Sequence, residues 1–558
     1  MRLASVMGFA LGTLLCAPSI LAATLIYNIN GYTMEGGQRI EFAAIEYHQG
    51  IVTATYQSAE AASQSTAELK IDAGGATLLP GLIDAHGHVS SYGAALANVD
   101  LNGATTEGEA TQRVADFIAK ADMDSSSWVK GRGWNQVLWP GKAFPTRATL
   151  DAVAPDRPVV LGRVDGHAAW VNTAALEAAG INRSTPDPVG GQIIRDSNGE
   201  PTGVLIDNAM DVVFETVGEP SVEQLELDIV TALNAVAATG ITGVHDAGIS
   251  AREAQAYRNL QAQGRLPIRV YAMLSVLDPA NDDYLDAGPY VSHDGMLQIR
   301  SVKISADGAL GSRGAALHQS YSDEPGHKGL LLLSDADLRH HIERSANAGF
   351  QVNVHAIGDL ANTRVLDEFQ RINTDPKVRA LRHRIEHAQI LRPSDIARFR
   401  DLGVVASIQP THATSDKNMA GDRLGEMRLQ GAYAWKTLID NKARVAGGSD
   451  FPVEPPEPLF GLHAAVTRTD REGNPLGGWR SHEILSREES LSLFTEWAAY
   501  SGHAEELLGR LQPGYAADFI LLRDNYFTQP VDDIWRNTVL TTVVGGKVVF
   551  ASSASPLQ

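Results

Sequence analysis

Short runs of β-branched and aromatic residues, separated by glycine-containing turns, fill both ends of the chain. They occur at residues 24–28, 39–43, 51–56, 517–522, 539–544 and 547–550. Alternation of this kind is typical of β-strands, and Gly545-Gly546 between two such runs predicts a tight hairpin. We therefore expect residues 24–80 and 512–558 to combine into one small β-sandwich domain.

The middle of the chain repeats a unit of amphipathic helix, glycine and apolar run. Ser221 and Gln224, for example, form a capping-box pattern at the start of a helix that stops near Gly240. The apolar runs predict strands at 82–88, 241–246, 268–274, 299–305, 351–355, 383–387, 404–409 and 444–450. Strands that alternate with helices indicate parallel βαβ units of the α/β class, and eight of them close a (β/α)8 TIM barrel. We expect this barrel over residues 81–511, with a doubly wound open sheet as the alternative.

The first two predicted strands are too far apart in the sequence for a single crossover helix to join them. Residues of about 123–222 contain glycine, proline and aromatic side chains throughout. We interpret this stretch as an insertion after barrel strand 1 that lies on the barrel.

Composition and charge narrow the class of protein. With 558 residues, 44% hydrophobic and 20% charged, the chain is an ordinary globular protein that needs two or three cooperating units. Its formal charge of −20 argues against nucleic acid and against stable association with an anionic membrane. We expect a small-molecule substrate instead, and leave a homo-oligomer open.

Residues 1–23 have the pattern of an export signal peptide. Arg2 is the only charged residue, residues 6–15 are apolar, and Leu21-Ala22-Ala23 supplies small residues for cleavage. The one cysteine, Cys16, lies in this segment, so a mature chain without it would have neither a disulfide nor a thiolate metal ligand. We expect a periplasmic or secreted protein, with a retained anchor helix or a lipid on Cys16 as alternatives.

The end of the first barrel strand carries the first candidate chemistry. Residues 79–88 run Leu-Pro-Gly-Leu-Ile-Asp-Ala-His-Gly-His. Side chains two apart on a strand point to the same side, so His86 and His88 can hold one metal ion together. A structural polar pair is the alternative for two histidines taken alone.

Several later predicted strands also end in residues of types that can bind a metal ion. Lys303, His355, His387 and Asp450 each lie at the C-terminal end of a predicted strand, where barrels place catalytic groups. A lysine inside a barrel is costly unless it is paired or neutral. Lys303 would therefore either form an ion pair with a carboxylate such as Asp450, or react as a neutral amine with CO2 to give a carbamate.

These residues, in this order, resemble the amidohydrolase superfamily. The segments around Lys303, His355, His387 and Asp450 resemble its family 3, which includes enzymes similar to N-substituted formamide deformylase. The resemblance implies a TIM barrel joined to a β-sandwich built from both termini. It also implies that His86, His88 and Asp450 bind the more buried metal, that His355 and His387 bind a second, and that carbamylated Lys303 bridges the two.

The resemblance further implies a metal-dependent hydrolase that acts on carbon–nitrogen bonds other than peptide bonds, or on an ester. One or two divalent ions would activate water, with Asp450 as the acid/base. Nitrogen and oxygen donors without cysteine favour zinc, with manganese, iron or nickel as alternatives. A deaminase on the same site, or a noncatalytic extracytoplasmic binding protein with a structural metal, are the competing functions.

Four further residues are candidate substrate contacts. The resemblance to family 3 implies that Asp165 and His167 face the pocket, with ordinary loop residues as the alternative. Arg313 could hold a substrate carboxylate, with a salt bridge as an equal alternative. Trp134 could line an apolar pocket together with Trp139 and Trp170, unless these rings form the insertion's own core.

Overall fold

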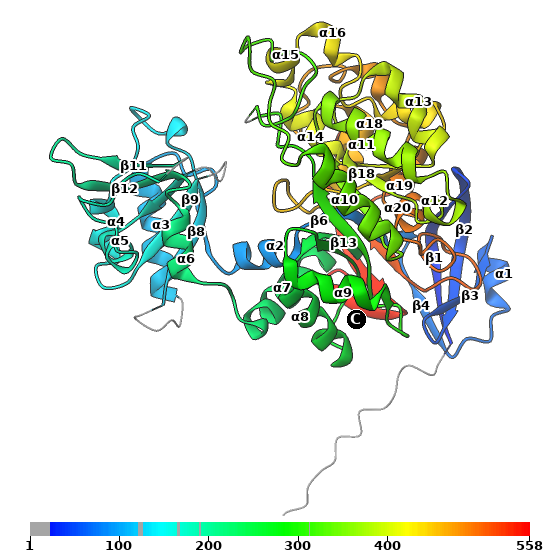
Figure 1. Cartoon of the computed structure of the whole chain (residues 1–558). Helices are drawn as coiled ribbons and strands as arrows, with labels where there is room; N and C mark the ends of the chain where they lie inside the picture. The colour runs from blue at the N-terminus through cyan, green and yellow to red at the C-terminus, as the bar shows by residue number, and fades with distance from the viewer. Residues whose placement is uncertain (1–22, 121–126, 164–167, 189–190, 312, 558) are drawn as a thin grey trace, which may run out of the picture.

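The computed structural model describes residues 23–120, 127–163, 168–188, 191–311 and 313–557. It consists of a large barrel, a sheet domain packed beside it, and a separate lobe (Figure 1). The predicted export signal lies outside the described residues except for Ala23. Across the described ranges, none of the helices combines the length and apolar character needed to cross a bilayer.

Eight parallel strands form the barrel, arranged in chain order around it. They are β6 (Leu82–Gly87), β13 (Ile241–Ile249), β14 (Arg269–Ser275), β16 (Leu297–Ser305), β17 (Gln351–Ala356), β18 (Arg384–His387), β19 (Val405–Ile408) and β20 (Arg444–Gly447). Beyond β20 the backbone N–H of Asp450 donates to the carbonyl of His86 (2.7 Å), which draws the last strand toward the first. The barrel prediction is confirmed, because a doubly wound sheet would not keep its strands in sequence order.

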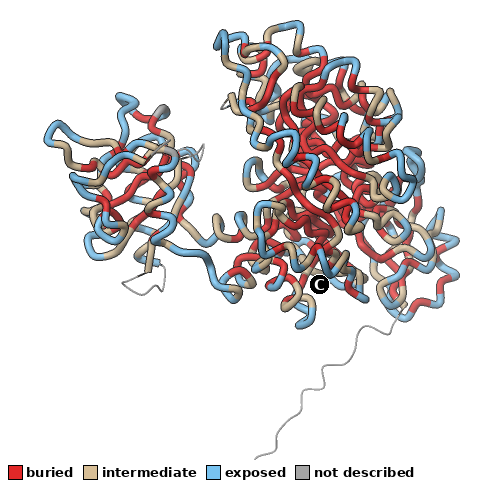
Figure 2. The backbone as a smooth tube through the Cα atoms, in the orientation of Figure 1, coloured by how far each residue is buried: buried red, intermediate tan, exposed pale blue. Residues whose placement is uncertain are grey.

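Helices cover the outside of the barrel. They include α7 (Val222–Ala237), α8 (Ala251–Ala262), α10 (Asp335–Asn347), α11 (Asp359–Ile372), α13 (Pro393–Leu402), α17 (Trp435–Asp440), α18 (Pro458–Thr467), α19 (Arg487–Leu493) and α20 (Glu496–Ser501). Strand residues alternate, so Val302 and Ile304 pack in the helix-facing core while Lys303 points inward. Buried backbone is densest in this barrel (Figure 2).

Both ends of the chain contribute to one sheet, as predicted. Its strands are β1 (Thr24–Glu35), β2 (Gln38–His48), β3 (Ile51–Tyr56), β4 (Leu69–Asp72), β5 (Thr77–Pro80), β21 (Phe519–Leu522), β22 (Val539–Val544) and β23 (Lys547–Ala551). The antiparallel pair β5–β21 joins the N-terminal part to the C-terminal part. A shift of register in β1 between Tyr27 and Gly31 separates the part that pairs with β4 from the part that pairs with β5, and the sheet encloses its own apolar core.

The insertion is a lobe of its own after barrel strand 1. It contains β7 (Val99–Asp100), α3 (Glu107–Lys120), β8 (Val129–Trp134), α4 (Arg147–Val153), β9 (Val159–Arg163), β10 (Ala168–Val171), α5 (Thr173–Ala178), β11 (Gly191–Arg195), β12 (Pro201–Asp207) and α6 (Asp211–Val217). Its sheet begins at Val99, ahead of the predicted start near 123, because the amphipathic pattern of α3 fits a barrel crossover equally well. Figure 1 shows the lobe standing apart, joined through α2 (Val89–Leu96) and the segment between α6 and α7.

Candidate metal centre

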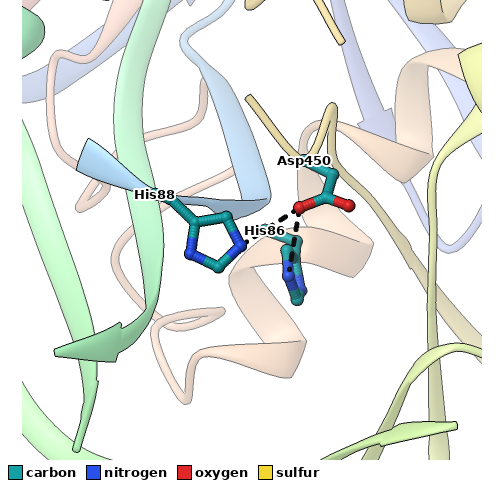
Figure 3. A group of neighbouring side chains, drawn as sticks. All are labelled: His86, His88 and Asp450. Atoms are coloured by element: carbon teal, nitrogen blue, oxygen red, sulfur yellow. Dashed lines mark ion pairs between the residues drawn. The ribbon is translucent and has the colours of Figure 1, made fainter. Parts of the chain in front are cut away.

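One carboxylate and two imidazoles meet where the first and last barrel strands end. His86 lies near the end of β6, His88 follows it, and Asp450 follows β20. Asp450 Oδ1 is 3.2 Å from His88 Nε2 and 3.5 Å from His86 Nε2. Figure 3 shows both rings facing the same carboxylate oxygen.

A second group of possible ligands shares the same carboxylate. Asp450 Oδ2 is 3.7 Å from His412 Nε2 and 4.0 Å from His387 Nδ1. The rings of His387 and His412 are stacked, with their centroids 5.9 Å apart. His412 lies in α14 (Pro410–Asp416), the short helix after β19.

Lys303 and His355 also lie at this centre, in less direct positions. Lys303 Nζ is 3.2 Å from His86 Nε2, so the lysine points at the metal-facing side of that ring. The ring of His355 is 4.6 Å from the ring of His387, and its Nε2 is 3.5 Å from Asp307 Oδ1. All six predicted metal-site residues therefore come together at the barrel mouth, although His355 faces Asp307.

The buried ion pair of Arg384 and Glu386 contacts the ring of His86. Glu386 Oε2 is 2.5 Å from His86 Nδ1, and Glu386 Oε1 is 2.8 Å from Arg384 Nε. The Arg384 guanidinium also donates to the carbonyl of Ala85 (2.6 Å) and to Ser407 Oγ (2.9 Å). Since Glu386 occupies Nδ1, the Nε2 of His86 is the ring nitrogen that faces Asp450.

Asp84 ties the loop that carries Asp450 to the first strand. Its carboxylate accepts from Ser449 N (3.1 Å), Ser449 Oγ (2.7 Å) and His86 N (3.0 Å). A Cβ at Gly448 would lie 2.6 Å from both Asp84 Oδ1 and His86 N, so only glycine fits this close approach. Asp450 itself has a φ of 65°, a strained conformation typical of functional sites.

Burial dominates the protonation of these groups. It lowers the pKa of His86 to about 4 and that of His355 to about 3, with the Lys303 charge as the next cause. Burial alone would raise the pKa of Asp450, but the His88 hydrogen bond and the neighbouring imidazoles hold it well below its usual value. These shifts favour a neutral imidazole at His86 and His355 and an ionised carboxylate at Asp450, which are the forms that bind metals.

The donor set fits a divalent cation. Zinc–ligand distances of about 2.0–2.2 Å place two ligands of one ion at most about 4.3 Å apart, and the Nε2 atoms of His88, His86 and His412 lie 3.2–3.7 Å from Asp450. The Nδ1 atom of His387 lies 2.8 Å from Gln409 Oε1, which leaves its Nε2 as the ligand atom. The Nε2 atoms of His355 and His412 are buried and make no hydrogen bond to any residue that the structure describes. Buried imidazole nitrogens without protein partners are consistent with ligands of an ion.

The predicted substrate contacts are placed elsewhere or are not described. Trp134 is fully buried in the core of the lobe with Trp139 and Trp170, and its Nε1 donates to the carbonyl of Leu161 (2.7 Å). Because it has no exposed surface, it cannot touch a substrate in this conformation. Arg313 pairs with Asp323 (2.9 Å) and Glu324 (3.1 Å) in its own loop. Asp165 and His167 lie outside the described residues.

Sequence reasoning missed three groups at this centre: His412, Glu386 and Asp84. His412 follows the end of the seventh predicted strand by three residues, in the run Gln409-Pro410-Thr411-His412. A histidine at this place was the signal that could have identified it as a site residue. Glu386 is adjacent to His387 and Asp84 lies two residues before His86, but the partners His86 of Glu386 and Ser449 of Asp84 lie hundreds of residues away.

The chain is similar to known proteins in both sequence and fold. The chain is 34% identical to "Putative amidohydrolase YtcJ" of Bacillus subtilis over 532 residues, 94% of this chain and 98% of that protein. It is 27% identical to "N-substituted formamide deformylase" of Arthrobacter pascens, over 87% of this chain and 90% of that protein. A solved structure of an uncharacterized metal-dependent hydrolase from Pyrococcus horikoshii superposes with a TM-score of 0.77 at 26% identity, covering 91% of this chain and 99% of the other.

The family model described as "Amidohydrolase family" matches residues 70–550. This span takes in the whole barrel, the lobe and the part of the terminal sheet from β4 to β23, but not β1, β2 or β3. The site at the barrel mouth, the fold and these relatives agree on a metal-dependent hydrolase, and the chain belongs to the amidohydrolase family.

Proposed function

We propose that this chain is an exported hydrolase that uses divalent zinc to cleave a carbon–nitrogen bond of an amide or cyclic amide, or an ester bond. The observation that carries the proposal is the Asp450 carboxylate, whose Oδ1 lies near His86 and His88 and whose Oδ2 lies near His387 and His412. The relative named as a formamide deformylase supports carbon–nitrogen cleavage.

The chain's own residues would perform the proton transfers. When bound, the cation supplies a Lewis acid that polarises a carbonyl and lowers the pKa of water. Asp450 accepts a proton from the attacking water and returns it to the leaving nitrogen or oxygen. His86, His88 and Asp450 would hold the cation, and the Glu386 contact keeps the His86 ring oriented.

Lys303 is proposed to carry a carbamate in the loaded protein. Burial lowers its pKa, which favours the neutral amine that reacts with CO2. Intact-mass measurement under native conditions should then show the extra mass of one CO2, which Lys303→Met should lack.

A cavity beside the barrel mouth supports a small-molecule substrate. Its volume is about 850 Å³, within the usual range for ligand pockets. Its lining includes Ser90, which lies two residues after His88, and Gly248, which packs against Lys303. Glu253 and Asp278 also line it, which favours neutral or cationic substrates over anionic ones.

A substrate panel with the zinc-loaded full-length protein tests the proposal. The panel contains N-acyl amides, formamides, lactones and dipeptides, and both carboxylate and ammonia release are measured. Asp450→Asn should lower kcat by about 10²–10⁴-fold on any substrate turned over. Asp401→Asn, on the exposed end of α13, is the matched control and should be unaffected.

The outcomes separate the competing functions. An unchanged rate in Asp450→Asn would remove that residue from the acid/base role. Ammonia release from an amine-bearing ring, without carboxylate, would favour a deaminase. Export is tested separately: full-length protein expressed in a bacterial host should appear outside the cytoplasm with its N-terminus trimmed near Ala23, and an untrimmed cytoplasmic product would contradict it.

A further inference from the structure

We infer that the cavity between α14 and α18 is a binding site for a small α-amino acid in its zwitterionic form. Its volume is about 160 Å³, roughly five times what one water molecule occupies in the liquid. Figure 1 shows α14 and α18 side by side. The inference goes beyond the proposed hydrolysis and does not depend on it, because the lining of the cavity includes none of the six predicted metal-site residues and not His412.

Two opposite charges line this cavity without pairing with each other. Glu454 and Arg471 both belong to the lining, and neither forms an ion pair with any residue that the structure describes. The guanidinium of Arg471 lies over the ring of Phe460, with Cζ 4.5 Å from the ring centroid. Stacking on a ring face leaves the N–H groups at the edge of the guanidinium free to bind a carboxylate through two hydrogen bonds. A zwitterion supplies a partner for each charge.

The hydroxyl groups of α14 offer acceptors for the ammonium end of such a ligand. Thr414 and Ser415 line the cavity. Thr414 Oγ1 donates to the carbonyl of Thr411 (2.9 Å), and Ser415 Oγ donates to the same carbonyl (3.3 Å). Because a carbonyl only accepts, each hydroxyl proton is already used and each hydroxyl oxygen keeps its acceptor lone pairs. These two oxygens and the Glu454 carboxylate match the three N–H donors of an ammonium group.

Thr411 is the buried polar residue of the lining that lacks a partner. It is 8% exposed, and no described residue of the chain forms a hydrogen bond with its Oγ1. A buried hydroxyl without a partner costs free energy, and a ligand carboxylate in the cavity would accept its proton. His463, on α18, is 3% exposed, and burial lowers its pKa, so its ring adds no charge to the cavity at neutral pH.

The remaining charges of the lining exclude a simple anion as the ligand. Asp470 is already paired with Lys417, at 3.0 Å. Glu472 is exposed and forms no ion pair with a described residue. Glu454 and Glu472 therefore outnumber Arg471, so a carboxylate without an accompanying ammonium would be repelled.

Matched ligands test the two ends of the zwitterion separately. Zinc-loaded full-length protein is titrated calorimetrically with L-alanine, with ethylamine, which lacks the carboxylate, and with propionate, which lacks the ammonium. Alanine should bind at least about tenfold more tightly than either, because each charge-assisted contact contributes about this factor. Ethylamine or propionate binding as tightly as alanine, or no alanine binding at tens of millimolar, would overturn the inference and leave the proposed hydrolysis untouched.

Variants locate the site, because an amino acid can also bind zinc directly through nitrogen and oxygen. Arg471→Gln and Glu454→Gln should each weaken alanine binding at least about tenfold while zinc content stays unchanged. Arg400→Gln, on the exposed end of α13, and Glu215→Gln, exposed on α6, are the matched controls and should bind alanine as the wild type does. Undiminished binding in either cavity variant would overturn the inference.

Thr411→Val separates a ligand contact from a structural role. Valine has a similar volume without the unpartnered hydroxyl, so the ligand-free variant should unfold at the same or a higher urea concentration than the wild type. Alanine should bind the variant several-fold more weakly. A variant that unfolds more easily and binds alanine normally would show that the hydroxyl has a structural partner, which removes the buried contact on which the inference rests.

Discussion

At the scale of single residues, the centre depends on charged groups that never touch solvent. Arg384 and Glu386 are both 0% exposed, and they lie beneath His86 inside the barrel. A buried ion pair is a weak source of stability, because desolvation offsets much of its attraction. Its effect here is to orient the ring: Glu386 accepts from Nδ1 of His86, so that Nε2 faces Asp450.

Replacement of Glu386 by glutamine tests this role. Glu386→Gln should weaken zinc binding by about 10–100-fold, as the loss of partners behind a metal ligand usually does. It should also lower the free energy of unfolding of the metal-free protein by about 3–5 kcal/mol, because Arg384 stays buried without its counter-ion. Competition with a chromophoric chelator measures the first effect and urea denaturation the second.

The control for this variant is another glutamate paired with an arginine. Glu505 pairs with Arg382 at 2.5 Å, but both side chains are partly exposed and lie away from the metal ligands. Glu505→Gln should leave zinc affinity unchanged. Equal affinities for Glu386→Gln and wild type would show that Glu386 is only a structural partner of Arg384.

At the scale of elements, the site exists only when the last strand closes on the first. Asp84 on β6 makes this closure, since it accepts from both the backbone and the hydroxyl of Ser449 after β20. The same carboxylate accepts from the N–H of His86, so closure and ligand position are set together.

Removal of the Asp84 side chain should therefore loosen the closure. Asp84→Ala leaves the buried N–H groups of Ser449 and His86 without an acceptor, at a cost of about 3 kcal/mol in the free energy of unfolding. Asp84→Asn keeps an acceptor oxygen and should cost less. Urea denaturation of the two variants provides the comparison, and equal stabilities would show that the acceptor does not matter.

The elements themselves were largely predictable from the sequence. Each predicted barrel strand is present. In an α/β protein, an apolar run that follows a glycine-terminated helix is typical of a buried parallel strand. The start of the lobe was not predictable, because α3 has the same amphipathic pattern as a crossover helix. The sequence likewise did not reveal whether Trp134, Trp139 and Trp170 faced a substrate or one another.

Site residues were predictable where they lie at the end of a single predicted strand. His86, His88, Lys303, His387 and Asp450 each mark a strand end, and the structure brings them together. His412 lies on α14, the helix that follows β19. The alternation of side chains along a strand therefore does not predict on which side the His412 side chain points. The roles of Glu386 and Asp84 depend on partners from distant strands, which no local pattern contains.

At the scale of the whole molecule, the lobe and the barrel have separate cores. Trp134, Trp139 and Trp170 pack with one another in the lobe, with centroids 6.1–6.3 Å apart.

Trp134→Ala should lower the free energy of unfolding of the lobe by about 3–5 kcal/mol through the cavity it leaves. Hydrogen exchange should rise in residues 129–206 while the barrel strands and zinc content stay unchanged; equal exchange increases in the barrel would show that the two cores unfold together.

The sheet domain, by contrast, is bonded directly to the barrel. Arg269 on β14 forms a two-pronged pair with Asp518, at 2.6 Å and 3.0 Å, and Asp518 also accepts from the N–H of Gly545 (2.7 Å). Both side chains are almost fully buried between the two parts. Breaking one side of such a pair leaves an uncompensated buried charge.

Arg269→Met should therefore destabilise the whole chain by about 3–5 kcal/mol, measured by urea denaturation. The double variant Arg269→Met/Asp518→Leu removes both charges and should recover much of that loss. Arg536→Met, in an exposed pair with Asp533, is the matched control and should change stability little. If the double variant were no more stable than the single one, the pair would contribute through its hydrogen bonds to the sheet domain rather than through charge compensation.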